Sequence, residues 1–372
     1  MVEGTMENRM PRRGERVAVA LSGGVDSAAA ALLLREAGCR VAAFTLRHLC
    51  EAEGRAAPVD DPAGDAARVA AALGIPHHVL GASDLFRDDV MEPFRREYLA
   101  GRTPNPCVVC NRAVKFGLLL DRVREEGYDR LATGHHARLA GPEGALRIRR
   151  AADRAKDQSY VLWAIDGAAL PRLAFPVGAM TKDEARRAAA AGLPAIDRPE
   201  SQDICFLGPG ELPRFLGDLR PGPILDGEGK RIGTHDGAAR YTIGQRKGLG
   251  VAAGEPLYVV ETDTRLNTVR LGREEELFAS AALLGDANFH APEEEALAGE
   301  ILVKIRSRHE PAPATLRRAG KGRLEVRFLR PQRAVTPGQS AVFYRGDALL
   351  GGAVIDFAIR AGAGGPDGAL RS

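Results

Sequence analysis

Residues 22–27, Ser-Gly-Gly-Val-Asp-Ser, form the clearest chemical motif of this 372-residue chain. They follow a short apolar run at 17–21 and precede an alanine- and leucine-rich segment at 28–37. The two glycines let a ligand approach the main chain, and the start of a helix adds unpaired N–H groups and a positive dipole end. The motif lacks the lysine of a Walker A loop. It therefore predicts a phosphate-binding loop of another kind.

Cysteines form a second group with chemical potential. The chain has five of them, an odd number, and its N-terminus is polar, which together favour reactive or metal-binding thiols over a disulfide framework. Cys107 and Cys110 follow two prolines that fix a rigid loop, and Cys205 ends a polar loop. We expect this geometry to deliver Cys110 to the start of a helix at 112–126, where the helix N-terminus lowers the pKa of a thiol.

Polar side chains cluster in three further places. His135 and His136 follow an apolar run at 131–133, although a plain surface turn is an alternative interpretation. Residues 156–160, Lys-Asp-Gln-Ser-Tyr, form a dense polar stretch. From 304 to 333 there are ten Lys or Arg against two Glu, a bias typical of surfaces that contact phosphates.

The elements that position these groups alternate in type. Strands are predicted at 17–21, 41–46, 77–80 and 131–133, and helices at 28–37, 65–73, 84–99 and 112–126. Such alternation predicts a parallel sheet with helices on both faces. Open sheets of this class bind ligands at the carboxyl ends of their strands, where the long loop at 47–64 is expected, and Leu46 is therefore expected to lie beside an adenine.

Three domains are predicted. Residues 1–207 form an α/β domain with a parallel sheet, 208–280 a small β-rich central domain, and 281–372 a C-terminal β-barrel. The expected strands of the last two are 241–243, 257–260, 268–270, 300–305, 324–328, 340–344 and 352–355. Residues 244–250 are too rich in glycine for a strand and are expected to form a loop. The absence of a long apolar run predicts a cytoplasmic protein without membrane contact.

Eight motifs in order resemble the signatures of the tRNA-specific 2-thiouridylases (MnmA/TrmU), members of the ATP pyrophosphatase, or PP-loop, superfamily. They are residues 22–27, 101–106, 110–111, 132–135, 156–160, 204–206, 244–250 and 336–342. The resemblance implies that ATP adenylates the 2-oxygen of a tRNA wobble uridine and that sulfur then replaces this oxygen. It implies Cys205 as the persulfide carrier, Cys110 as its catalytic partner and Asp26 as a residue acting through Mg²⁺.

The resemblance also implies two binding sites. The ATP site comprises Ala20, Leu21, Ser22, Gly23, Gly24, Val25, Asp26, Ser27, Leu46 and Gly134. The tRNA site comprises Asn105, Pro106, Cys107, His135, Lys156, Asp157, Gln158, Arg306, Ser307 and Gln339. The expected partners are tRNAs for Lys, Glu and Gln and a persulfide donor such as a cysteine desulfurase or a sulfur-relay protein. No residue is assigned as a resident metal ligand.

Cys107 departs from the aspartate that several family members carry at this position. With Cys110 and Cys205 it makes three thiols, the number that holds an iron–sulfur cluster in some related tRNA thiolases. We favour the persulfide route over such a cluster. Two other hypotheses stay open: an adenylating amide synthetase of the same superfamily, which needs no cysteine pair, and a tRNA-binding protein without catalysis.

Overall fold

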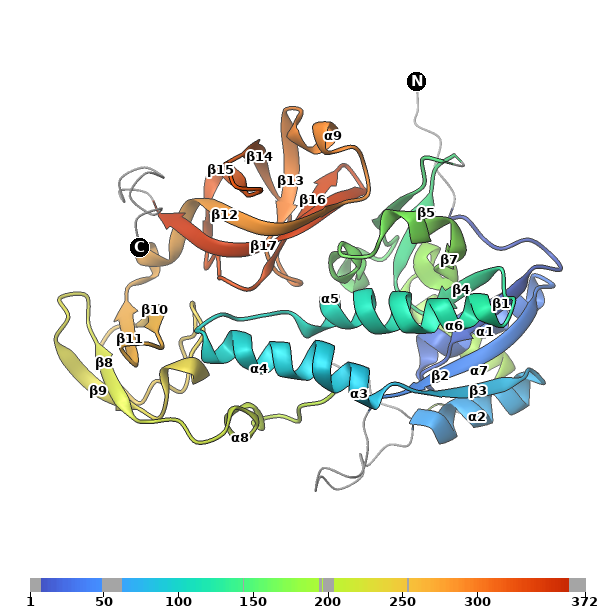
Figure 1. Cartoon of the computed structure of the whole chain (residues 1–372), viewed down its shortest axis with the longest axis horizontal. Coiled ribbons are helices and arrows are strands. Elements are labelled where there is room, and N and C mark those ends of the chain that lie inside the picture. Colours follow the sequence, from blue (N-terminus) through green and yellow to red (C-terminus); the bar gives the residue numbers. More distant parts are fainter. Residues whose placement is uncertain are drawn as a thin grey trace.

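The computed structural model describes residues 8–48, 62–142, 144–193, 196, 204–252 and 254–360. It contains a parallel sheet, a small second sheet and a barrel, which lie at the right, the lower left and the upper left of Figure 1. No helix within the described ranges is long and apolar enough to cross a membrane. The predicted three-part architecture is confirmed. The divisions after residues 207 and 280 stay a prediction, and the first barrel strand already begins at Phe278.

The first sheet has the strand order β3-β2-β1-β4-β7, and every neighbouring pair is parallel. Its strands are β1 (Arg16–Ala20), β2 (Arg40–Arg47), β3 (His77–Gly81), β4 (Arg130–Thr133) and β7 (Leu173–Ala174). The associated helices are α1 (Val25–Glu36), α2 (Pro62–Leu73) and α7 (Lys182–Gly192). Four small residues of α1, 28–31, are fully buried and let this helix pack closely on the sheet. The predicted strands and the first two helices are thus confirmed.

Two longer helical stretches extend from this sheet toward the second one (Figure 1). One consists of α3 (Ser83–Phe86), a π-helical turn at Arg87–Met91 and α4 (Glu92–Leu99). The other consists of α5 (Pro106–Cys110), a π-helical segment at Asn111–Leu118 and α6 (Leu119–Glu125). The predicted start at residue 112 is therefore wrong. The helix begins at Pro106 because Asn105 caps it, its side chain accepting a hydrogen bond from the Cys107 N–H at 3.1 Å.

The second sheet has the order β10-β11-β8-β9. Its elements are β8 (Gly222–Leu225), β9 (Arg231–His235), β10 (Tyr258–Asp263) and β11 (Thr268–Gly272), preceded by α8 (Leu212–Leu216). The strand predicted at 241–243 is wrong: this segment continues a 3-10 turn at Ala238–Arg240 into a tight turn at Gly244, whose φ is 87°. Thr242 and Ile243 favour a strand by composition, but the backbone here makes turn hydrogen bonds instead of hydrogen bonds to a neighbouring strand. These bonds run from the Tyr241 N–H to Ala238 O and from the Gln245 N–H to Thr242 O.

The barrel is antiparallel and closed by the pairing of β12 with β17. Its strands are β12 (Phe278–Phe289), β13 (Glu300–Lys304), β14 (Ala312–Arg318), β15 (Leu324–Arg333), β16 (Ser340–Arg345) and β17 (Ala348–Arg360), with α9 (Glu293–Leu297) between the first two. The hairpin β5 (Ala137–Ala140) and β6 (Arg147–Arg150) adds to this sheet at β17, where Arg149 pairs with Ala348. Hence a hairpin of the first domain extends the sheet of the third.

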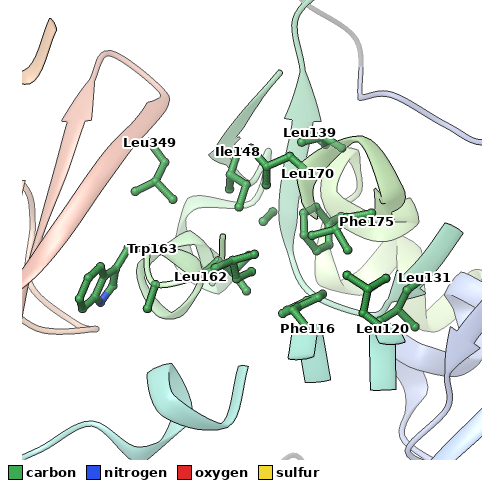
Figure 2. Packing of buried hydrophobic residues seen from close by; sticks show 14 of the residues in the cluster. Phe116, Leu120, Leu131, Leu139, Ile148, Leu162, Trp163, Leu170, Phe175 and Leu349 are labelled. Atoms are coloured by element: carbon green, nitrogen blue, oxygen red, sulfur yellow. The ribbon is translucent and has the colours of Figure 1, made fainter. Parts of the chain in front are cut away.

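The first domain and the barrel also share an apolar core. Figure 2 shows Leu349 of β17 in one cluster with Ile148 and Trp163. The Trp163 Nε1–H donates to Ser340 Oγ at 2.9 Å, and Gly352 lies so close that a Cβ there would come 2.7 Å from the indole. This close packing fixes the barrel against the parallel-sheet domain. Short 3-10 turns complete the junction at Arg154–Lys156, Ser159–Leu162, Gly167–Arg172 and Pro176–Ala179. A further 3-10 turn, Glu274–Leu277, directly precedes the first barrel strand.

Candidate active site

The phosphate loop connects β1 to α1 as the sequence predicts. Gly23 has a φ of 76°, which turns the chain sharply after the strand. Ser27 Oγ donates to Gly24 O at 2.9 Å and accepts from the Ser22 N–H at 3.2 Å. Gly24 is the N-cap of α1 and provides no side-chain cap, so N–H groups of the first turn remain available to a ligand. The loop is therefore built to receive an anion.

Asp26, in the first turn of α1, is held by two residues that the sequence analysis did not assign. Lys182 Nζ donates to both carboxylate oxygens of Asp26, at 2.8 and 2.7 Å, and His136 Nε2 donates to one of them at 3.1 Å. Lys182 is the first residue of α7, which a capping box of Thr181 and Glu184 fixes. The capping box is a local feature of the sequence, but nothing in the neighbouring residues indicates that it aims a lysine at the loop.

The charge state of this site follows from these contacts. Burial alone raises the pKa of Asp26, but the hydrogen bonds from His136 and Lys182 outweigh it and hold the pKa below its usual value. Asp26 is thus ionised at neutral pH. A Mg²⁺ ion that accompanies a nucleotide is usually held by one or two carboxylates and by the phosphates, so this single carboxylate fits that role. No group of three or more His, Cys, Asp or Glu among the described residues is arranged for a metal ion.

Gly134 and Leu46, two of the residues predicted for the ATP site, lie at the carboxyl ends of β4 and β2. Leu46 is half-buried near the carboxyl end of β2, beside β1. Gly134 follows β4 and packs against the start of α1: a Cβ on it would come 2.5 Å from Ser27 N and 2.6 Å from Asp26 C. Only glycine allows this approach, because both contacts are with backbone atoms that cannot turn aside.

We expect Gly134→Ala to weaken ATP binding and to lower the free energy of unfolding by about 1–3 kcal/mol, the usual cost of overpacking. The added methyl group displaces the first turn of α1 and with it Asp26. Titration with ATP and denaturant unfolding measure the two effects. Gly81→Ala is the control, since nothing lies within 4 Å of a Cβ there. Equal ATP affinity in both variants would contradict the assigned role.

The helix that begins at Pro106 brings the thiols together. Cys110 packs against the same apolar cluster as Ile204 and Phe206, the neighbours of Cys205 in the chain. Cys110 and Cys205 also interact electrostatically, as do Cys107 and Cys205. All three are free thiols; Cys107 and Cys205 reach the protein surface, but enough protein surrounds each thiol to desolvate it. Folding thus unites thiols that lie far apart in sequence.

The predicted lowering of the Cys110 pKa is wrong. Desolvation by the surrounding protein raises the pKa of Cys107 and of Cys110, and it raises that of Cys205 to about 12, with both other thiols adding to the rise. Cys110 also lies at the end of α5, one helical turn beyond the free N–H groups of its start. The ammonium of Lys115, a residue that the sequence did not single out, lowers the pKa of all three thiols and so partly offsets the desolvation.

Residues 101–106 form a junction between the three parts of the protein. Thr103 donates its N–H to Pro337 O at 2.8 Å, and its carbonyl accepts from Gln339 Nε2 at 2.7 Å, both on the barrel. Its hydroxyl also reaches Thr242 of the central part at 3.5 Å. The predicted base-site residues Asn105 and Pro106 follow directly. Gln339 is therefore placed to hold this loop.

The other residues predicted to contact tRNA differ in accessibility. The Asp157 side chain is fully buried and accepts from Arg150, from two backbone N–H groups and from the Ser159 hydroxyl, so its carboxylate is already used internally. Gln158 Oε1 accepts from the His136 N–H at 2.9 Å and ties this segment to the turn at 134–136. Ser307 and Gln158 are exposed, whereas Arg306, Lys156 and Asn105 are half-buried.

His135 is buried, and its Nδ1 lies 2.8 Å from the Thr133 hydroxyl. Burial, followed by Lys115 and His136, keeps its pKa well below the usual value, so the ring is neutral at pH 7. Residues 49–61 and 197–203, which include Cys50 and the predicted polar loops, lie outside the described residues.

A parallel sheet whose first strand leads into this phosphate loop defines a nucleotide-binding domain of the PP-loop type. Three family models match the chain: a tRNA methyl transferase HUP domain at residues 15–209, a tRNA methyl transferase PRC-barrel domain at 212–273 and an aminomethyltransferase beta-barrel domain at 280–355. Each match falls on one of the three parts described above.

Curated relatives agree over nearly the whole length. The tRNA-specific 2-thiouridylase MnmA of Sorangium cellulosum is 44% identical over 367 residues, covering 94% of each chain. Those of Chloroflexus aurantiacus and Pelotomaculum thermopropionicum are 47% and 44% identical, covering 90% and 92% of this chain and 97% of each relative. This chain belongs to the MnmA family of tRNA-specific 2-thiouridylases.

Proposed function

We propose that this protein replaces the 2-oxygen of a tRNA wobble uridine by sulfur, with ATP as the activating substrate and a persulfide on Cys205 as the sulfur carrier. The observation that carries the proposal is the closeness of two reaction centres. The helix that carries Cys110 reaches the turn at 134–136 through Phe116, whose ring centroid lies 5.9 Å from that of His135. The neighbouring His136 binds Asp26 of the phosphate loop at 3.1 Å. One uracil ring held near 105–110 can thus meet both ATP and sulfur.

The first step activates the base. The uracil 2-oxygen attacks the α-phosphorus of ATP, and pyrophosphate leaves into the loop at 22–27. The first-turn N–H groups of α1 and the Lys182 ammonium stabilise the charge that develops on the phosphates. Asp26 would hold the Mg²⁺ that accompanies the nucleotide, and this ion would neutralise phosphate charge. The 2-oxygen then leaves with AMP when sulfur attacks carbon 2.

The second step delivers sulfur. Either the Cys110 thiolate attacks the inner sulfur of the Cys205 persulfide and expels hydrosulfide, which attacks carbon 2, or the terminal sulfur attacks carbon 2 first and Cys110 then expels the thiolated base. Both routes form one disulfide between Cys110 and Cys205, which a thiol reductant must reopen. We propose the cytoplasm as the compartment, because a reducing environment can reopen this disulfide.

The tRNA-binding part of the proposal rests on the junction at 101–106 and on the barrel residues 304–333, which include ten Lys or Arg and two Glu. Single-stranded RNA is read with its bases splayed out, so a wobble uridine can be drawn into the loop that bears Asn105 and Pro106. We propose tRNAs for Lys, Glu and Gln as substrates and a cysteine desulfurase or a sulfur-relay protein as the persulfide donor.

The decisive experiment is reconstitution with ATP, a persulfide donor and unmodified tRNA, followed by nucleoside mass analysis and pyrophosphate measurement. We expect 2-thiouridine and pyrophosphate in equal amounts. Pyrophosphate without thiouridine, retained in a Cys110→Ser, Cys205→Ser variant, would favour an adenylating synthetase. Binding of tRNA without pyrophosphate release would favour a non-catalytic tRNA-binding protein.

We expect tRNA affinity to fall steeply with salt, because each bound phosphate releases counterions. Replacing Arg306 and Arg308 by glutamine should reduce the slope of log K against log salt by about one for each phosphate that the variant no longer binds. Binding titrations at several salt concentrations measure it. Replacing Arg122 and Arg124, exposed arginines of α6 that pair with neighbouring carboxylates, removes the same charge as a control. An unchanged slope in the first variant would place the RNA footprint elsewhere.

A further inference from the structure

Lys115 lies in the π-helical segment Asn111–Leu118, five positions after Cys110. In an α-helix, residues five apart are rotated by about 140° and face different sides. A π-helix bonds residue i to i+5 and therefore stacks such residues on one face. The spacing is seen directly at Gly117, where a Cβ would come 3.0 Å from the Arg112 carbonyl oxygen. The π-helical register thus turns Lys115 toward the side of the helix that carries Cys110.

Lys115 has no counter-ion within the described part of the chain. It is half-buried, and no carboxylate there forms an ion pair with it. The groups that interact electrostatically with Lys115 are instead three thiols, Cys107, Cys110 and Cys205, and the neutral ring of His135. A half-buried ammonium without an anion beside ionisable sulfurs is the arrangement expected of an anion site.

Sulfur transfer creates that anion. When Cys110 attacks the inner sulfur of the Cys205 persulfide, one S–S bond forms and one breaks, and the electron pair leaves with the terminal sulfur. The negative charge begins on Cys110 and ends on hydrosulfide, so it stays on sulfur throughout. Desolvation of these thiols opposes every such species, and a fixed cation offsets that cost.

We propose, on the basis of the sulfur transfer inferred above, that Lys115 is the cation that stabilises the sulfur anions formed on Cys110 and Cys205. It acts as a positioning residue, through the thiols and not on the uracil. Lys115 also interacts electrostatically with Cys107, which lies at the exposed start of the same helix. The π-helical segment is the structural device that makes this possible, since a regular α-helix from Pro106 would point Lys115 away from Cys110.

The test measures the reactivity of each thiol with iodoacetamide over a range of pH, by peptide mass spectrometry on the full chain without ATP or tRNA. We expect Lys115→Gln to slow alkylation of Cys110 at neutral pH by about tenfold, equivalent to a pKa rise of about one. Lys115→Arg should restore the rate, and Lys115→Met provides a second uncharged variant if the glutamine variant does not fold. Arg112→Gln is the matched control, because it removes an exposed cation from the same helix.

Equal alkylation profiles for the wild type and the folded uncharged variants would overturn the role of Lys115. The role of Lys115 would also be overturned if Cys110 were alkylated as slowly in Lys115→Arg as in Lys115→Gln, because the slower alkylation would then reflect a structural change and not the lost charge. Alkylation does not depend on ATP or tRNA. A wild-type protein that forms no 2-thiouridine would therefore overturn the proposed function while leaving the alkylation result in place.

Discussion

Replacing Asp26 by alanine or asparagine is expected to lower pyrophosphate release by about 10³-fold or more while leaving tRNA affinity nearly unchanged. Asp26 lies at the phosphate loop, and its side-chain partners Lys182 and His136 are not among the residues proposed to contact RNA. Pyrophosphate release with ATP and tRNA, together with a tRNA binding titration, measures the two effects.

Removing Asp26 also leaves Lys182 without its anion, which makes a loss of folding the main confounding effect. Asparagine keeps the size of the side chain, and thermal unfolding of both variants checks that they fold. Asp183→Asn is the matched control, because it removes a carboxylate from the start of α7 that is 76% exposed. Thiolation at the wild-type rate in a folded Asp26 variant would refute the assignment of the loop.

The second large effect concerns the thiols. Cys110→Ser and Cys205→Ser should each abolish 2-thiouridine formation, because the persulfide route needs one thiol to carry sulfur and another to release it. Cys107→Ser should keep most of the activity and give a colourless protein without iron. Nucleoside mass analysis and iron and sulfide determination on protein purified without oxygen are the measurements. Cys39→Ala, at a buried thiol beside β2, is the control.

An iron–sulfur cluster on the three thiols predicts a different pattern. The wild-type protein would then be brown, and Cys107→Ser would lose colour, iron and activity together. An inactive Cys107→Ser protein that still folds and binds tRNA would therefore contradict the persulfide route.

The pH dependence of the free enzyme follows from the raised pKa values of Cys110 and Cys205. The reactive species is the thiolate, whose fraction grows as the pH approaches the pKa from below. The rise in reactivity is thus displaced to higher pH than for a free cysteine. The pKa shift of Cys110 is opposite in sign to the one that a helix N-terminus predicts, because desolvation is its largest cause and Cys110 lies at the end of α5.

Local sequence determined the phosphate loop, the alternation of strands and helices around it and the family. The glycines at 23 and 24, the apolar run before them and the helix after them act within a few residues, so spacing alone was sufficient. The motifs around Cys107, Cys110 and Cys205 are also local, so the sequence singled out the thiols that the fold brings to one cluster. Predictions failed where a competing local contact decided the structure: Asn105 began the helix early, and the turn at Gly244 replaced a strand.

Only the tertiary structure decided how these motifs work together. It aims Lys182 of α7 at Asp26, a residue 156 positions away, and it buries the Asp157 carboxylate among internal donors. It also reverses the expected direction of the Cys110 pKa. Contacts over such separations, and the desolvation that accompanies packing, depend on the assembled fold and leave no pattern in neighbouring residues. The sequence therefore determined which groups the protein has, and the fold determined their charge and their partners.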